Sequence, residues 1–270
     1  MRKLLPAGLL TALGVAVAPL QAQVTPTNAH WSLKGLRSGM CVEFLVSPDA
    51  ATDALDGRFT PTPIERLGSS FPVLAREAAA DPSHAGWVPA RLCWFAFDSA
   101  FTKGRKIKVD GGRNSVVVGY VGISAILPQD TTAMVGASIF TNAGPLASVA
   151  SDARLKVDMV RYTFGTIPEL ETSPDERRHQ IQYGKLTLQW DGHVGGPRPA
   201  EVQDIHLTVR SNGMGLFAVA ANVAADSAFV AAGNLRMTGS GKLVSMMAAS
   251  PIRQVGSYLK GGDVEWDFSR

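Results

Sequence analysis

The sequence predicts a mainly β protein: a single antiparallel domain, barrel-like or built from two sheets, with two or three short helices. Many short apolar or alternating segments are separated by turn residues, which is typical of strands joined by tight connections. No regular succession of strand, helix and strand is present, which argues against a parallel sheet. The 27 glycines favour turns, and a hydrophobic content of 46% suits a packed core rather than disorder.

The first 22 residues have the pattern of a secretory signal peptide. Arg2 and Lys3 precede the uncharged apolar run Leu4–Leu20, and Leu20-Gln21-Ala22 offers a cleavage site. The run is too short and wrongly flanked for a stable membrane span, and no Cys follows it that could carry a lipid. We therefore expect a periplasmic or secreted protein with an extended segment at 23–39 and one β-rich domain at 40–270.

Three elements are predicted in the first part of that domain. Met40, Val42, Phe44 and Val46 alternate with other residues and indicate a strand at 40–46. A short helix is expected at 71–80, because Pro72 suits its first turn and Asp81-Pro82 ends it. The segment 92–97 is apolar on both faces, which predicts a central strand with Trp94 in the core.

The rest of the chain continues in the same manner. Segments 105–110 and 115–125 flank Gly111-Gly112 and predict a hairpin. In 179–190 the inward-facing parity changes at Gly184, which predicts a β-bulge there and places Trp190 in the core. Ser250-Pro251 and Gly261-Gly262 bracket a late helix. Further strands are predicted at 133–140, 154–164, 202–210, 214–223, 234–247 and 263–268.

Cys41 and Cys93 are the two cysteines of the chain. An even number in an exported protein favours a disulfide between them, with two buried free thiols as the alternative. The closed loop would be long, so the chain-entropy model gives about 4 kcal/mol of stabilisation. Two cysteines at this separation do not form a zinc site by themselves.

Charge and motifs limit the partners. Arg2 and Lys3 belong to the predicted leader, so the remaining chain is close to neutral and lacks the field expected of a nucleic-acid-binding protein. Gly213-Met214-Gly215 lacks the context of a dinucleotide site, and Gly239-Ser240-Gly241-Lys242 lacks that of a phosphate loop. None of the five histidines has metal-ligand spacing. We expect no cofactor and no metal, a possible small-molecule ligand, and an oligomeric state that the sequence leaves undecided.

A run of basic residues near the predicted hairpin offers a possible anion-binding site. Lys106 and Lys108 would share one face of a strand. The run either binds an anionic partner or forms the solvated face of an edge hairpin, where lysines discourage edge-to-edge pairing. We favour the edge role, because alternation sends Arg105 to the opposite face. The five residues are Lys103, Arg105, Lys106, Lys108 and Arg113.

The stretch Cys41–Ala50, running on to Phe59-Thr60-Pro61-Thr62-Pro63, resembles the opening of acetoacetate-decarboxylase-like domains. The resemblance covers about 25 residues and implies a large, mostly antiparallel barrel. In that family a Lys in a Trp-Gly-aromatic-Pro-Lys context forms a Schiff base. Lys106 and Lys108 lie outside any such context, so the resemblance implies architecture and no catalytic residue is transferred.

These observations lead to a functional expectation with two alternatives. The leading expectation is an exported soluble β-rich protein that binds a small molecule in an interior cavity without catalysis. The first alternative is an acetoacetate-decarboxylase-like enzyme with a Schiff-base lysine, for which Lys106 and Lys108 are the candidates. The second alternative is an outer-membrane β-barrel, disfavoured because several strands are apolar on both faces.

Overall fold

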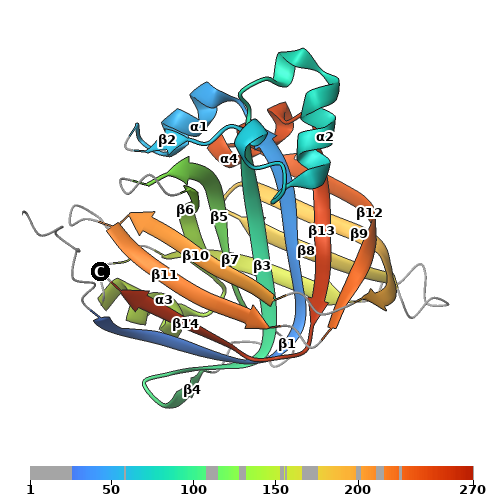
Figure 1. Cartoon of the computed structure of the whole chain (residues 1–270). Coiled ribbons are helices and arrows are strands. Elements are labelled where there is room, and N and C mark those ends of the chain that lie inside the picture. Colours follow the sequence, from blue (N-terminus) through green and yellow to red (C-terminus); the bar gives the residue numbers. More distant parts are fainter. Residues whose placement is uncertain are drawn as a thin grey trace, which may run out of the picture.

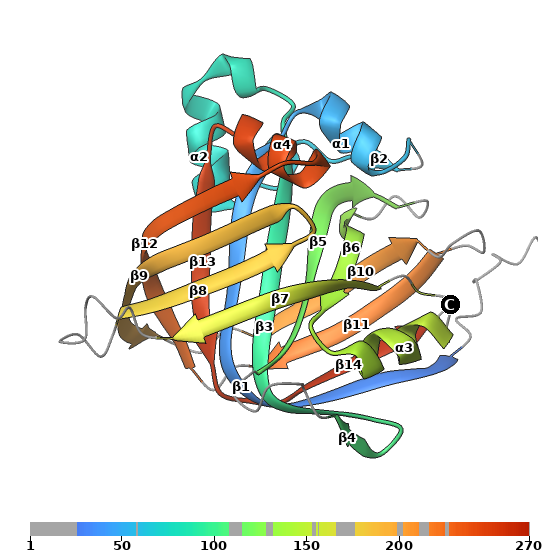
Figure 2. The ribbon, with the colours of Figure 1, turned by 180° about the vertical axis from the view of Figure 1, so that it is seen from behind.

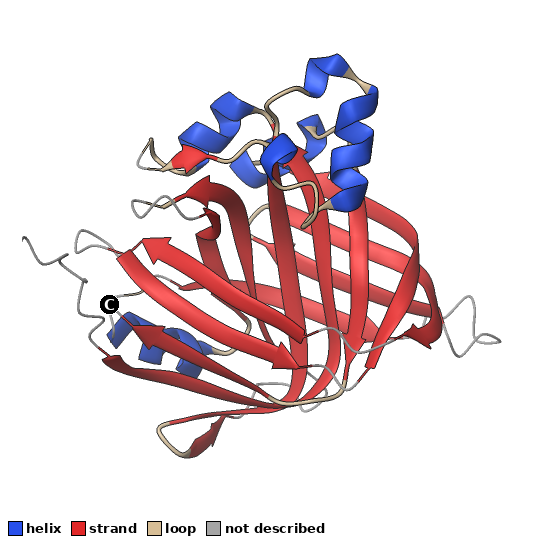
Figure 3. Ribbon diagram, in the orientation of Figure 1, coloured by secondary structure: helices blue, strands red, loops and turns tan. Residues whose placement is uncertain are grey.

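The fold is a highly curved, mostly antiparallel sheet that wraps into a nearly closed barrel, with helices gathered mainly at one end (Figures 1 and 3). The computed structural model describes residues 26–57, 59–107, 115–127, 132–152, 155, 157–165, 176–198, 202–210, 216–224 and 227–269. The predicted leader 1–22 lies outside these residues. The mainly β fold class predicted from the sequence is confirmed.

Fourteen strands form one sheet. They are β1 (Pro26–Val46), β2 (Thr60–Pro61), β3 (Val88–Thr102), β4 (Arg105–Ile107), β5 (Val116–Ile126), β6 (Thr132–Thr141), β7 (Val157–Gly165), β8 (Glu176–Tyr183), β9 (Leu186–Arg198), β10 (Val202–Arg210), β11 (Leu216–Ala224), β12 (Ser227–Gly239), β13 (Arg253–Lys260) and β14 (Val264–Ser269).

Two additional pairings, β1 with β3 and β10 with β6, close the sheet into two rings of hydrogen-bonded neighbours. The front ring contains β1, β3, β5, β6, β10, β11 and β14. The back ring contains β1, β3, β5, β6, β7, β8, β9, β12 and β13. The strands common to both, β1, β3, β5 and β6, form a shared wall. Figures 1 and 2 show β10 and β11 on one side of this wall and β7 to β9 on the other.

The shared wall explains why its strands are apolar on both faces. Every residue of β5 except the last is buried, and β3 is buried along most of its length. One core packs on the front face and includes Cys41, Phe95 and Trp266. Another packs on the back face and includes Trp94 and Trp190, both at most 1% exposed, which confirms their predicted core positions.

The helices are short. They are α1 (Pro48–Ala54), α2 (Pro72–Ala80), α3 (Gly144–Asp152) and α4 (Lys242–Ala249), with 3-10 turns η1 (Ile64–Arg66) and η2 (Pro82–His84). Helices α1, α2 and α4 lie at one end of the barrel (Figure 2), and α3 packs against β1, β6 and β7. The helix predicted at 71–80 is confirmed as α2. No helix within the described ranges has the length and apolar character that crossing a membrane requires.

Several predicted elements near the C-terminus are wrong. The predicted late helix, bracketed by Ser250-Pro251 and Gly261-Gly262, is largely strand β13, because its residues complete the back ring between β1 and β12. The second part of the strand predicted at 234–247 is helix α4, whose Met246 and Met247 enter the back core. Gly184 is a turn residue with φ of 58° joining β8 to β9, not a bulge, so the parity change marks two antiparallel strands.

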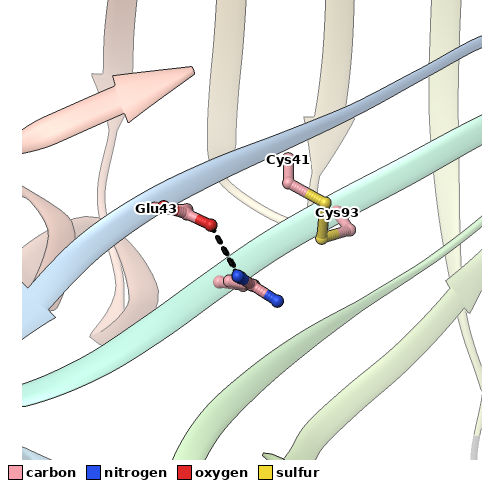
Figure 4. The surroundings of a disulfide bond; sticks show 4 residues. Cys41, Glu43 and Cys93 are labelled. Atoms are coloured by element: carbon pink, nitrogen blue, oxygen red, sulfur yellow. Dashed lines mark hydrogen bonds and ion pairs between the residues drawn. A yellow bond between two sulfur atoms is a disulfide. The ribbon is translucent and has the colours of Figure 1, made fainter. Parts of the chain in front are cut away.

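The disulfide predicted between Cys41 and Cys93 is confirmed (Figure 4). The two residues face each other directly in the register of β1 and β3, with Cα atoms 4.0 Å apart. Both are buried in the front core. The bond therefore fixes the two longest neighbouring strands of the shared wall to each other.

Candidate functional site

An open cavity of about 530 Å³ lies at the helical end of the back ring, and we call it the mouth pocket. Its wall comes from β5, β6, the β8–β9 turn and the start of α4, and α1 contributes one residue. Apart from Ala137, the apolar members belong to the back core or pack against it. The lining residues are Ala54, Val121, Ala137, Ser138, Tyr183, Lys185, Leu186, Ser240, Gly241, Lys242, Leu243, Val244 and Met246.

A β-bulge in β6 shapes one side of the pocket. The register passes from Val121↔Ser138 to Gly122↔Gly136, so Ala137 is an extra residue on β6. A bulge reorients side chains locally, and here the consecutive residues Ala137 and Ser138 both line the cavity. In a regular strand, Ala137 and Ser138 would point to opposite faces, and only one of them could line the cavity.

Three polar side chains from neighbouring strands meet at this wall, and we call them the hydroxyl–carboxylate cluster. Ser138 Oγ donates to Asp158 Oδ2 at 2.7 Å. The Tyr183 hydroxyl lies 2.8 Å from Asp158 Oδ2 and 2.6 Å from Ser138 Oγ. Burial raises the pKa of Tyr183 well above its usual value of 10.0, and the nearby Asp158 carboxylate raises this pKa further, against the lowering effect of Ser138. Tyr183 is therefore a neutral phenol at physiological pH.

Lys185 is placed at the rim by a tight turn. Gly184 and Lys185 connect Tyr183 of β8 to Leu186 of β9. The Lys185 carbonyl accepts a hydrogen bond from the Ser240 amide at 3.3 Å. Gly239, with φ of 123°, lies so close that a Cβ there would be 1.8 Å from the same carbonyl oxygen. The glycine thus allows the β8–β9 turn to pack against the segment that leads into α4.

A second lysine lines the pocket at the start of α4. Lys242 Nζ donates to the Asp53 carbonyl of α1 at 2.8 Å, which joins the two helices above the cavity. An ammonium has three donors, so this bond leaves further donors for other partners. The pocket consequently combines apolar side chains, the two amines of Lys185 and Lys242, and the three hydroxyls of Ser138, Tyr183 and Ser240.

Another polar cluster lies on the front face of the shared wall. Glu43 Oε1 accepts from Arg91 Nε and Nη2, both at 2.8 Å, and Glu43 Oε2 accepts from Gln254 at 3.2 Å. The Arg91 guanidinium lies 4.4 Å from the centre of the Phe71 ring. Tyr120 lies nearby, opposite Cys93 in the register, and burial raises its pKa to about 12. The Glu43 carboxylate is thus satisfied by protein groups.

The basic residues singled out in the sequence lie elsewhere. Arg105 and Lys106 are exposed on β4, at one end of the strand order, and Lys103 pairs with Asp152 at 3.4 Å. Lys108 and Arg113 lie outside the described residues. None of the lysines with a described side-chain environment is buried: these are Lys34, Lys103, Lys106, Lys185 and Lys242.

Sequence reasoning missed the mouth pocket because its residues come from distant segments. Ser138 and Asp158 lie in two predicted strands with no motif around them, and the alternation in 179–190 places Tyr183 within one long predicted strand. Tyr183-Gly184-Lys185 could have been identified as a hairpin turn, since a Gly at this position suits a positive φ. Within the described part of the chain, no cluster of three or more His, Cys, Asp or Glu residues could hold a metal ion.

Comparison with known proteins identifies the fold. No protein-family model matches the chain, and no curated protein matches it in sequence. Solved structures match it nearly end to end. An enduracididine biosynthesis enzyme, MppR, complexed with pyruvate superposes with a TM-score of 0.53 at 13% identity, covering 97% of this chain and 96% of that one. An acetoacetate decarboxylase superposes with a TM-score of 0.50 at 7% identity, covering 91% and 89%.

These matches confirm the acetoacetate-decarboxylase-like architecture inferred from the opening strand. They also correct the functional expectation. The leading interpretation of ligand binding without catalysis is contradicted by the structural neighbours, which are enzymes. The expectation against an enzyme depends on the absence of catalytic motifs. A site assembled from separate strands has no local sequence motif, so that absence does not exclude an enzyme. The neighbours favour the first alternative and give no support to an outer-membrane protein.

Proposed function

We propose that this chain is an enzyme that binds a small oxo acid in the mouth pocket and forms an imine with it through the Lys185 amine. The mouth pocket carries the proposal: it is an open cavity of about 530 Å³ with an apolar floor and two lysines. The fold supports it as well, since a structural neighbour has been solved in complex with pyruvate. Pyruvate is a small 2-oxo acid, and the cavity is large enough to accept it.

The two pocket lysines have separate roles in this chemistry. Unprotonated Lys185 Nζ adds to the carbonyl carbon, giving a carbinolamine that loses water to form the imine. Lys242, tied to Asp53 of α1, supplies a positive charge for the acid's carboxylate. The protonated imine accepts the electron pair of a bond broken at the neighbouring carbon. This supports either loss of carbon dioxide from a 3-oxo acid or loss of a proton from a 2-oxo acid.

Borohydride trapping tests the proposal. The full chain is incubated with pyruvate or acetoacetate, reduced with borohydride, digested and mapped by mass spectrometry. We expect one reduced adduct on the peptide containing Lys185. Lys185→Arg keeps the charge but cannot form the imine, and it should abolish the adduct.

Two controls make the result specific. Lys106→Arg alters an exposed lysine on β4 and should leave the adduct unchanged. Lys242→Met should slow trapping by about tenfold through loss of one charge-assisted contact. An adduct on Lys106 or Lys108 would instead support the candidates named from the sequence. The absence of any adduct with either oxo acid would reject the imine.

We also propose that the protein is exported from the cytoplasm. The Cys41–Cys93 bond is compatible with an oxidising compartment, and residues 1–22 have the pattern of a leader. Expression of the full chain followed by mass spectrometry of the mature protein tests this. Cleavage after Ala22 and recovery from the periplasm or medium are expected, whereas an intact N-terminus in the cytoplasm would contradict export.

A further inference from the structure

The hydroxyl–carboxylate cluster gives the mouth pocket a wall that accepts hydrogen bonds. A serine or tyrosine hydroxyl carries one proton, and an ionised carboxylate carries none. Ser138 donates its proton to Asp158 at 2.7 Å. The Tyr183 hydroxyl also donates its proton within the cluster, where its two possible acceptors are Asp158 Oδ2 at 2.8 Å and Ser138 Oγ at 2.6 Å.

The position of the cluster decides which atoms a ligand meets. Ser138 and Tyr183 line the cavity, whereas Asp158 is outside the lining and holds both from the neighbouring strand β7. Because their protons are used within the cluster, the two hydroxyl oxygens offer lone pairs to the cavity. The adjacent Asp158 carboxylate adds negative potential at the same place. This wall therefore favours a ligand group that donates hydrogen bonds and carries positive charge.

The opposite polarity lies at the rim. Lys185 and Lys242 line the same cavity, and so do the apolar residues Val121, Leu186 and Met246. A matching ligand thus has an ammonium group, a carboxylate and an aliphatic portion. We infer that the mouth pocket has a subsite for an aliphatic α-amino acid, with its ammonium on Ser138 and Tyr183 and its carboxylate toward Lys242.

This inference rests on the proposed function for the location of the site, and it names a second class of ligand for it. An oxo acid presents a carbonyl oxygen, which is an acceptor, so the wall does not match it. Its carbonyl is expected to face Lys185 instead, where the imine forms. The oxo acid and the amino acid consequently share Lys242 for their carboxylates, but the carbonyl and the ammonium contact different walls of the cavity.

The test compares ligands that differ at one carbon. Calorimetric titration of the full chain with L-leucine and with 4-methylpentanoate isolates the ammonium, because the two acids share the carboxylate and the aliphatic chain. We expect leucine to bind at least about tenfold more tightly, the range for a hydrogen bond to a charged group. Equal affinities, or no binding of leucine at millimolar concentration, would overturn the inference.

Variants show whether the cluster is responsible. Asp158→Asn removes the charge at nearly constant shape and should bring the two affinities within about threefold, since less than 1 kcal/mol of preference then remains. Ser138→Ala removes one hydrogen-bond acceptor and should also reduce the difference in affinity between leucine and 4-methylpentanoate. This second variant keeps the test available if Asp158→Asn does not fold. Asp152→Asn, an exposed carboxylate paired with Lys103, is the matched control and should leave the gap unchanged.

Lys242→Met provides a different readout. It should weaken leucine and 4-methylpentanoate by the same factor, because both carry the carboxylate. If leucine still binds more tightly than 4-methylpentanoate by the wild-type factor in Asp158→Asn and Ser138→Ala, the cluster does not bind the ammonium group and the inference is wrong. Borohydride trapping of pyruvate at Lys185 in the same preparations separates the two proposals: trapping without a leucine preference rejects the amino-acid subsite alone, and the reverse rejects the imine alone.

Discussion

Two polar clusters lie on opposite faces of the shared wall, and they differ in where their hydrogen bonds end. On the front face, Glu43 accepts from Arg91 and Gln254, and Phe71 lies over the guanidinium. On the back face, Ser138 and Tyr183 direct their protons within their cluster and line a cavity. The first arrangement satisfies its own carboxylate and stabilises the wall. The second leaves acceptors available, and this makes it a candidate ligand site.

The largest predicted effect belongs to the front face. Replacing both Cys41 and Cys93 by Ala should lower the free energy of unfolding by about 4 kcal/mol, because the bond closes a loop between residues 52 positions apart. Urea unfolding monitored by circular dichroism measures this. Pyruvate trapping should continue at the wild-type rate wherever the variant is folded. A decrease in the free energy of unfolding below about 1 kcal/mol, or a loss of pyruvate trapping in the folded variant, would contradict the assignment of stability to the front face and reactivity to the back face.

Glu43→Gln should cost about 2 kcal/mol, since Arg91 keeps its position but loses the neighbouring charge in a half-buried site. Equilibrium urea unfolding is again the measurement. Glu77→Gln is the matched control, because Glu77 pairs with Arg76 on the exposed surface of α2 and should change stability by less than about 0.5 kcal/mol. Equal losses in the two variants would contradict the stabilising role of the front cluster.

Tyr120 should make the protein less stable at alkaline pH. Burial raises its pKa from 10.0 to about 12, with Glu43 adding to the rise and Arg91 opposing it. Below pH 10 both folded and unfolded chains hold the phenolic proton. Above pH 10 the unfolded chain releases it first, so stability falls by about 1.4 kcal/mol per pH unit until about pH 12. Unfolding midpoints across this range should fall less steeply in Tyr120→Phe, and identical slopes would contradict the assignment.

The smallest predicted effect concerns the exposed basic hairpin. Lys106→Ala should change the free energy of unfolding by less than about 0.5 kcal/mol, because Lys106 is exposed on a short edge strand. Thermal unfolding and pyruvate trapping together check this. A loss of trapping without a loss of stability would move the reactive amine from the pocket to the hairpin.

Local patterns in the sequence predicted much of the fold. Both-face apolarity in 92–97 correctly identified a central strand, because that strand has a core on each side. The Pro72 start of α2 and the pairing of Cys41 with Cys93 also follow from local or compartment-based reasoning. The helix prediction for the segment beginning near Arg253 is wrong. Its flanking Pro and Gly residues suit a helix, but pairing with β1 and β12 makes the segment a strand.

The candidate site was much less predictable. Ser138, Asp158 and Tyr183 meet only because β6, β7 and β8 are neighbours, and the pairing of β6 with β7 is parallel between strands joined through α3. The bulge at Ala137 depends on a register that no local pattern specifies. Lys185 was included within a long predicted strand, so its place at the rim of a cavity could not be inferred.

The most direct test of the account is a crystal structure of the full chain treated with pyruvate and borohydride. We predict continuous density from Lys185 Nζ to a reduced three-carbon acid, with its carboxylate toward Lys242 and the mouth pocket otherwise arranged as described. Density on another lysine, or an unmodified Lys185 in a chain that carries the adduct elsewhere, would contradict the central claim that the open back-face pocket is the reactive site.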